Sequence, residues 1–182
     1  MEEQLLMVDS TRSNGPAEIV MDYIISYTLR SSYNNEEKPL FEKAARSILF
    51  HLLGEKDDGQ QIIDVKVWKQ WKRIDLIVEV NLKDGDSKEK HVIIIEDKYY
   101  TAPHDNQLQR YKESAEEYYN KDWQKHYVLI TAVYRSDKTF DDIYSDVEKD
   151  GFKIYSIKEL VNNITKPTES DIFNQFWLAD WH

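Results

Sequence analysis

The feature that most constrains the fold is an uninterrupted apolar run, Val92–Ile95, which ends abruptly in a Glu-Asp-Lys triplet at 96–98. Four β-branched residues in succession favour a β-strand. Because successive side chains of a strand point to opposite faces, both faces of this strand must be covered. The run therefore predicts a central strand with helices packed on both sides. The charged triplet marks the place where the buried strand emerges at the end of the sheet.

The segments around this strand predict the other elements. Helical periodicity, a proline start and the stop at Gly54 indicate helices at 16–33 and 39–53, and period-two patterns indicate strands at 62–68 and 74–82. The other expected elements are a strand at 91–98, a helix from 105 or 106 to about 119, strands at 127–134 and 152–157, and helices at about 157–164 and 171–182. This order predicts an α/β (α+β) fold, a mixed central β-sheet flanked by helices, in one domain over residues 1–182 with its core at about 40–157.

The residue patterns also predict which side chains face the core. In the strand at 62–68, alternation places Ile63, Val65 and Val67 on one buried face. An Asp-Gly pair at 84–85 predicts a hairpin between the next two strands. The apolar stripe of the helix at 39–53 consists of Leu40, Phe41, Ala44, Ala45, Ile48, Leu49 and Leu52.

Composition limits the classes of protein that the chain can belong to. It has 182 residues, no cysteine and a net charge of −10, so disulfides and thiolate metal sites are excluded. No apolar run approaches the ~20 residues of a membrane helix, and the acidic start lacks the features of a signal peptide, so we expect a cytoplasmic protein without membrane association. The charge is uneven: residues 61–112 carry ten Lys/Arg against nine Asp/Glu, which leaves −11 for the remainder. Any contact with a polyanion is expected in that window.

Three polar residues are expected to converge at one end of the sheet. Glu96 and Lys98 share one face of their strand, whereas the side chain of Asp97 points to the other face. If the hairpin is a simple one, Asp75 lies opposite about residue 98. Carboxylate oxygens at such a place suit Mg²⁺ or Mn²⁺, which polarise a phosphate and lower the pKa of a bound water. A lysine beside them can orient or deprotonate that water, or neutralise charge that builds up on the phosphate.

The pattern Asp75, then Glu96-x-Lys98, resembles the active-site signature of the PD-(D/E)XK nucleases. Gln107 and Tyr111, in the order Q-x-x-x-Y, resemble an extra motif of the RecB-like branch of that superfamily. The text IIEDKYYTAPHDNQLQRY is similar to a bacterial subgroup that also carries a glutamate early in a preceding helix. In this chain Glu42, followed by Leu49, Leu52 and Leu53, fits that spacing.

The resemblance covers roughly residues 40–134 and implies an αβββαβ restriction-endonuclease-like core. It implies that Asp75 and Glu96 are metal ligands and that Lys98 is the catalytic lysine. It further implies that Glu42 is an auxiliary metal ligand or holds a water. Gln107 and Tyr111 would assist near the lysine and the phosphate, and the backbone carbonyl of Asp97 would be a further metal ligand.

A basic segment just before Asp75 is a candidate nucleic-acid contact. Residues 66–73, KVWKQWKR, carry four cations and no anion, and they include Trp68 and Trp71. Cations meet phosphates, and a tryptophan either stacks on a splayed base or packs in the core. The residues expected to contact the nucleic-acid backbone are Lys66, Lys69, Lys72, Arg73 and Arg110.

These observations leave three hypotheses. The first is a metal-dependent nuclease that cuts nucleic acid, DNA above all, in phage defence, restriction or repair. The second is a nuclease-like fold that has lost its chemistry and serves as a nucleic-acid-binding or protein-interaction module. The third is an interaction protein with a chance motif.

Two other groups of residues, the C-terminal aromatics and the histidines, have expected roles outside the chemistry. Trp177 and Trp181 are interpreted as core or interface aromatics. The spacing of Trp177, Leu178 and Trp181 suits packing on a partner chain, either a second copy or another protein. The histidines show no metal-ligand spacing and are interpreted as surface or boundary residues; they are His51, His91, His104, His126 and His182.

Overall fold

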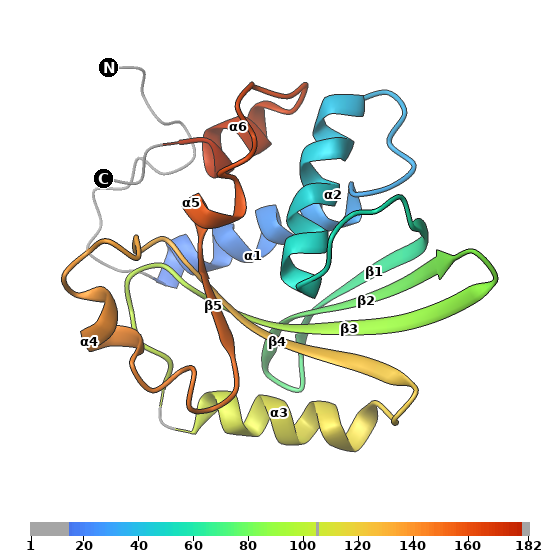
Figure 1. Cartoon of the computed structure of the whole chain (residues 1–182). Coiled ribbons are helices and arrows are strands. Elements are labelled where there is room, and N and C mark those ends of the chain that lie inside the picture. Colours follow the sequence, from blue (N-terminus) through green and yellow to red (C-terminus); the bar gives the residue numbers. More distant parts are fainter. Residues whose placement is uncertain (1–14, 105, 180–182) are drawn as a thin grey trace.

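The computed structural model describes residues 15–104 and 106–179 and centres on a five-stranded sheet with the strand order β1-β2-β3-β4-β5 (Figure 1). The strands are β1 (Gln61–Trp71), β2 (Ile74–Asp84), β3 (Ser87–Lys98), β4 (Trp123–Thr131) and β5 (Lys153–Ser156). β1, β2 and β3 pair antiparallel, whereas β4 pairs parallel with both β3 and β5. The mixed sheet flanked by helices is the fold expected from the sequence.

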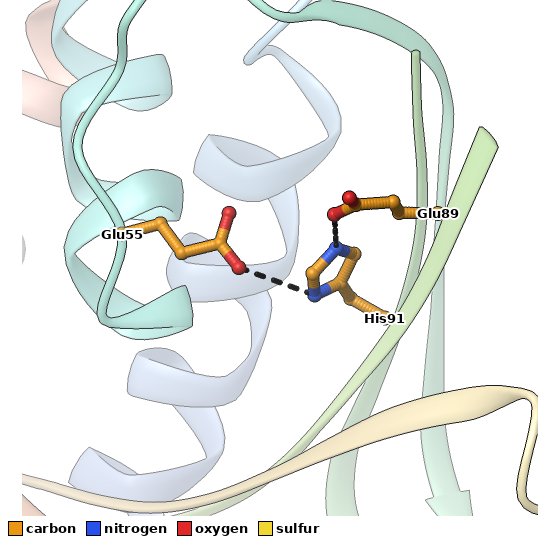
Figure 2. A group of neighbouring side chains, drawn as sticks. All are labelled: Glu55, Glu89 and His91. Carbon is orange, nitrogen blue, oxygen red and sulfur yellow. Dashed lines mark hydrogen bonds and ion pairs between the residues drawn. The ribbon is translucent and has the colours of Figure 1, made fainter. Parts of the chain in front are cut away.

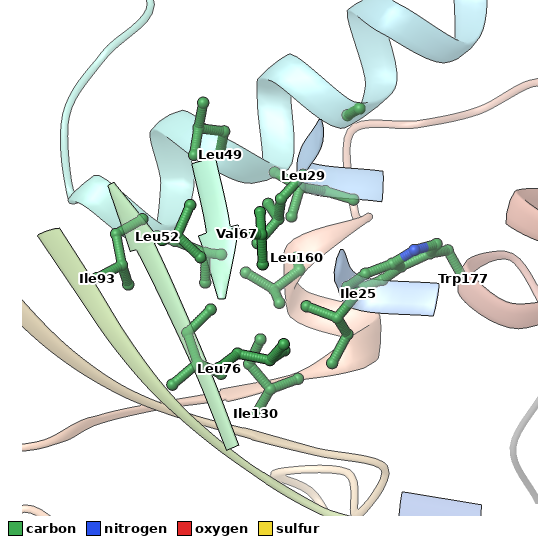
Figure 3. Close-up of a cluster of buried hydrophobic side chains, with 14 of the residues drawn as sticks. Ile25, Leu29, Leu49, Leu52, Val67, Leu76, Ile93, Ile130, Leu160 and Trp177 are labelled. Carbon is green, nitrogen blue, oxygen red and sulfur yellow. The ribbon is translucent and has the colours of Figure 1, made fainter. Parts of the chain in front are cut away.

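Helices cover both faces of the sheet (Figure 1). The helices are α1 (Gly15–Arg30), α2 (Pro39–Leu53), α3 (Gln107–Tyr118), α4 (Phe140–Tyr144), α5 (Ile157–Leu160) and α6 (Asp171–Trp177). On the face that we call the α2 face, α1, α2, α5 and α6 bury their apolar side chains against the sheet. On the opposite face, the α3 face, α3 and α4 do the same. Figure 3 shows the core of the α2 face, where Leu52 of α2 and Ile93 of β3 belong to the same cluster.

The middle of β3 is buried on both faces, as its apolar run predicts. All four side chains from Val92 to Ile95 are fully buried. Ile93 and Ile95 belong to the α2 face, and Val92 and Ile94 to the α3 face. This double burial makes β3 the strand on which both layers of helices depend.

The element bounds differ from the expected ones mainly at the ends. The first helix ends at Arg30 rather than 33, β1 extends to Trp71, and the fourth strand is 123–131 rather than 127–134. α4 was not expected from the sequence. The second helix ends before Gly54, which has a φ of 71° and a backbone N–H that donates to the helix carbonyls, as a glycine stop predicts.

Two residues expected in the core lie outside it. Ile63 is 42% exposed because the pairing of β1 with β2 shifts register between Ile62 and Asp64. This bulge turns Ile62 inward in place of Ile63, and the regular alternation resumes with Val65. Leu40, in the first turn of α2, is 53% exposed, although the rest of the predicted stripe is buried.

The aromatic tail packs within its own chain. Trp177 is fully buried, and its Nε1–H donates a hydrogen bond to Thr28 Oγ1 of α1 at 2.8 Å. Trp177 is therefore a core residue, one of the two roles expected for it, and is not exposed to a partner chain. Leu178 is partly buried against the same core, and Trp181 lies outside the described residues. None of the described helices is long and apolar enough to cross a membrane.

The two sides of α2 should respond differently to truncation. Leu52→Ala removes a fully buried side chain and should lower the free energy of unfolding by about 2–5 kcal/mol. Leu40→Ala, on the exposed side of the same helix, should change it by about 0.5 kcal/mol or less. Urea denaturation of both variants measures the difference, and equal losses would contradict the orientation of α2.

Candidate active site

The hairpin of β2 and β3 brings Asp75 beside Glu96. The two strands pair from Asp84–Ser87, around a tight turn at Gly85 and Asp86, to Leu76–Ile95. Continued by one residue, this register places Asp75 opposite Glu96 rather than opposite Lys98. The expected register was two residues off because the turn is centred on Gly85 and Asp86, one residue earlier than the centre of the expected connection at 83–90. Gly85 supports that turn with a φ of 57°.

Glu96 and Lys98 form a buried ion pair on the α3 face. The side chain of Glu96 is fully buried, and Lys98 Nζ lies 2.6 Å from its Oε1. Neither Glu96 oxygen accepts a well-aligned hydrogen bond from any residue that the structure describes. A buried carboxylate without such partners is costly unless a further cation or proton reaches it.

The electrostatics of this group reflect an excess of carboxylates. Burial first, and then the adjacent Asp75, raise the pKa of Glu96 to about 8 against the opposing effect of Lys98. Burial works against the charged form of Lys98, but Glu96, Glu18 and Asp75 together raise the pKa of its ammonium above the usual value. Three carboxylates thus surround one lysine.

Two helpers expected from the sequence lie at the same place. Gln107 and Tyr111, one turn apart on α3, are joined by a hydrogen bond from Gln107 Nε2 to the Tyr111 hydroxyl at 2.9 Å. Burial, Glu96 and Asp75 raise the pKa of Tyr111 well above its ordinary range. The phenol therefore stays protonated beside the carboxylates and can donate a hydrogen bond to them or to a ligand.

The helical glutamate near the site is Glu18, not Glu42. Glu42 Oε2 accepts a hydrogen bond from the Asn35 backbone at 2.6 Å, and none of its described contacts joins it to Asp75, Glu96 or Lys98. Glu18, in the first turn of α1, lies with its Oε2 3.9 Å from Lys98 Nζ. Its other oxygen accepts from Thr101 Oγ1 at 2.8 Å. A first-turn acid is common in helices, so the sequence carried no signal that singled out Glu18.

A second carboxyl pair, also missed from the sequence, lies behind the site. The Asp97 side chain points to the α2 face, as alternation predicts, and there it meets Asp22 of α1. Burial raises the pKa of both carboxyl groups, and their mutual contact adds to the shift at Asp97. Gln70 Nε2 donates to Asp75 Oδ1 at 3.1 Å and to Asp22 Oδ2 at 3.4 Å, so it links the two carboxyl pairs.

The basic residues expected to contact nucleic acid do not form one surface. Lys72, Arg73 and Arg110 line a cavity of about 500 Å³ that also includes Gln107 and Tyr111.

The other members of the basic set lie elsewhere. Lys69 is on the α1 side, with its Nζ 3.0 Å from the centre of the Tyr23 ring, and Lys66 pairs with Asp64 at 3.4 Å. Trp71 packs partly buried against the α3 face, where it meets Tyr118 edge-on, whereas Trp68 is 51% exposed. Trp68 is thus the tryptophan that is free to stack on a base.

The oxygens of Asp75 and Glu96 could hold a divalent cation. The oxygens of Asp75 and Glu96 are the hard ligands that Mg²⁺ or Mn²⁺ prefers. The fit rests on the two Glu96 oxygens that no well-aligned hydrogen bond satisfies. Asp75, Glu96 and Lys98 are therefore brought together as a group able to bind a cation and a phosphate.

The interpretation of the histidines as surface or boundary residues is wrong for His91, and His182 lies outside the described residues. His91 is fully buried on β3, directly before the apolar run that Glu96 follows. The sequence did contain a signal for a polar pair here: Glu89 and His91 are two residues apart, so their side chains share one face of a strand.

Comparison with known proteins identifies a family. A family model described as the PD-(D/E)XK nuclease superfamily matches residues 16–175, which removes the hypothesis of a chance motif. No curated protein matches the chain significantly. A solved structure of the MspJI restriction endonuclease in complex with a 27-mer oligonucleotide is similar, with 12% sequence identity and a TM-score of 0.35. That match covers 85% of this chain and 36% of the endonuclease chain.

The raised pKa of Glu96 predicts a pH dependence of stability in metal-free buffer. A carboxyl group with a pKa of about 8 in the folded state and an ordinary value of 4.5 binds its proton more tightly when folded. Its contribution to stability is therefore present below pH 4.5 and is lost as pH rises to about 8. Glu96→Gln keeps the shape and removes the titration, so it should gain stability over the wild type across this window.

The measurement is urea denaturation in the presence of a chelator, with the exposed Glu37→Gln as the control. The difference between Glu96→Gln and the wild type should grow with pH, on the order of a few kcal/mol. A difference that does not change with pH would show that Glu96 titrates normally.

Proposed function

We propose, since this chain belongs to the PD-(D/E)XK nuclease superfamily, that it is a nuclease that hydrolyses phosphodiester bonds of DNA with the help of Mg²⁺ or Mn²⁺. The observation that carries the proposal is the buried Glu96 beside Asp75, with Lys98 Nζ 2.6 Å from Glu96 Oε1. The proposed setting is the cytoplasm, in restriction, phage defence or repair.

The proposed roles follow from the contacts. Asp75 and Glu96 hold the cation, with the Asp97 carbonyl as a further proposed ligand. A divalent cation, when bound, supplies positive charge to the scissile phosphate and acidifies the attacking water. Lys98, held by Glu96 and Glu18, offers a second positive charge to the phosphate as negative charge develops on it.

The residues of α3 complete the proposed site. Gln107 fixes the hydroxyl of Tyr111 by a hydrogen bond, and this pair positions the water or the phosphate next to Lys98. The adjoining cavity offers Lys72, Arg73 and Arg110 to the phosphates that flank the scissile bond. Trp68, half exposed on β1, offers a stacking surface to a base.

A binding module that has lost its chemistry is the second candidate. The net charge of −10 favours this candidate. The direct contact of Lys98 with Glu96 also favours it, because neutralising a buried carboxylate would by itself account for a lysine at this place. The two candidates differ in what Lys98 does, and substitution of that residue separates them.

Lys98→Ala should reduce single-turnover DNA cleavage by ~10²-fold or more at saturating Mg²⁺, the scale of losing an acid–base or charge-stabilising group. Asp75→Asn should abolish cleavage while the protein remains folded. DNA affinity of Lys98→Ala should fall far less, because the cavity cations still meet phosphates. Lys121→Ala, which removes an exposed lysine, is the matched control. In the binding module, Lys98→Ala lowers the melting temperature and the wild type shows no cleavage to lose.

The cavity cations should account for part of the salt dependence of binding. Arg110→Gln should weaken DNA binding about equally for all sequences and reduce the slope of log affinity against log salt by about 1. Fluorescence anisotropy at several salt concentrations measures this slope, with Lys121→Ala as the control. An unchanged slope would place the phosphate path elsewhere on the surface.

A further inference from the structure

A second group of polar side chains gathers at the other end of the apolar run of β3 (Figure 2). His91 is fully buried there, while Glu89 on the same strand and Glu55, just after α2, reach it from the partly exposed rim. Glu96 is the fifth residue after His91, which corresponds to roughly 16 Å along a strand. This group is therefore distinct from the group of Asp75, Glu96 and Lys98.

Both ring nitrogens of His91 face possible metal ligands. Nε2 lies 3.3 Å from Glu89 Oε2, and Nδ1 lies 3.8 Å from Glu55 Oε1. Nδ1 also lies 3.1 Å from Nε2 of His126 on the neighbouring β4. Figure 2 shows the two glutamates approaching the ring from its two nitrogens. A lone pair of an imidazole repels a carboxylate or a second lone pair, so each of these contacts needs a proton or a metal cation between the two atoms.

We propose that Glu55, His91 and His126, with Glu89 as a further ligand or as the acceptor that orients His91, bind a transition-metal dication of the zinc class. Ligands about 2.0–2.1 Å from a tetrahedral zinc ion lie roughly 3.3 Å from one another. The 3.1 Å and 3.8 Å separations around His91 Nδ1 are near that value. In this arrangement Glu89 is the carboxylate partner that commonly fixes the orientation of a metal-bound histidine.

The ligand types set the identity of the cation. Two imidazoles with carboxylates favour zinc-class ions, whereas Mg²⁺ prefers oxygen ligands alone. His126 Nε2 faces His91 Nδ1 at 3.1 Å, so the two imidazoles present their nitrogens to the same place. The partly exposed glutamates give an ion access from solvent. The bound cation would join the end of α2 to β3 and β4.

Lys153 is the neighbouring cation that such an ion must tolerate. Its Nζ lies 2.9 Å from the position that a Cβ on Gly54 would occupy, next to Glu55, and its charge acts on His126. In the absence of a metal this ammonium offsets part of the charge of the glutamates. Lys153→Met should therefore tighten binding of the dication, because it removes a like charge.

The test is calorimetric titration with Zn²⁺ in excess Mg²⁺, together with the absorption spectrum of the Co²⁺-loaded protein. We expect one Zn²⁺ per chain and a tetrahedral Co²⁺ spectrum. Glu55→Gln, His126→Gln and His91→Gln should each weaken Zn²⁺ binding at least ~10-fold. His91 is buried, so its variant can fail to fold. In that case Glu55→Gln and His126→Gln carry the test.

Two controls separate this site from the proposed nuclease site. Glu37→Gln, which removes an exposed carboxylate, should leave Zn²⁺ affinity unchanged. Asp75→Asn should also retain one Zn²⁺ per chain, whether or not the wild type cleaves DNA. Unchanged Zn²⁺ affinity in both Glu55→Gln and His126→Gln would overturn the proposal and would show that protons alone join these four side chains.

Discussion

The structure depends on the burial of β3 between two layers of helices. Its apolar centre packs α2 on one face and α3 on the other, and this burial supplies most of the reason for the strand to lie where it does. The same burial excludes water from the polar residues that flank the apolar centre. Glu96 on one side of it and His91 on the other are fully buried, so each must find its partners within the protein or in a bound ligand.

The parts of the site that could be predicted from the sequence follow from local periodicity. Alternation along β3 placed Glu96 and Lys98 on one face, and helical spacing placed Gln107 beside Tyr111. Glu18 could not be found in this way, because its contacts with Lys98 and Thr101 join segments about 80 residues apart. The family match spans residues 16–175 and thus includes α1, whereas the resemblance noted from the sequence began at residue 40.

The errors in the fold arose where one residue changes the register. The bulge at Ile63 exchanges the inward and outward positions of β1 at one point only, which regular alternation cannot express. The tight turn at Gly85 moved the partner of Asp75 from 98 to 96. That shift brings two carboxyl groups into direct contact, and their contact is one cause of the raised pKa of Glu96. The chemistry of the site therefore depends on the position of a turn at the far end of the hairpin.

The net charge of −10 argues against a nucleic-acid enzyme only if the acidic side chains lie on the surface. Asp22, Glu96 and Asp97 are buried together near one end of β3, where burial and the charge of Asp75 raise the pKa of each carboxyl group. Groups held in this way contribute less negative charge to the outer surface than their number suggests. Meanwhile Lys72, Arg73 and Arg110 line the cavity beside Gln107 and Tyr111. The charges are thus separated by depth: the buried carboxylates lie behind a cavity whose wall carries these three cations together with Glu113 and Glu117.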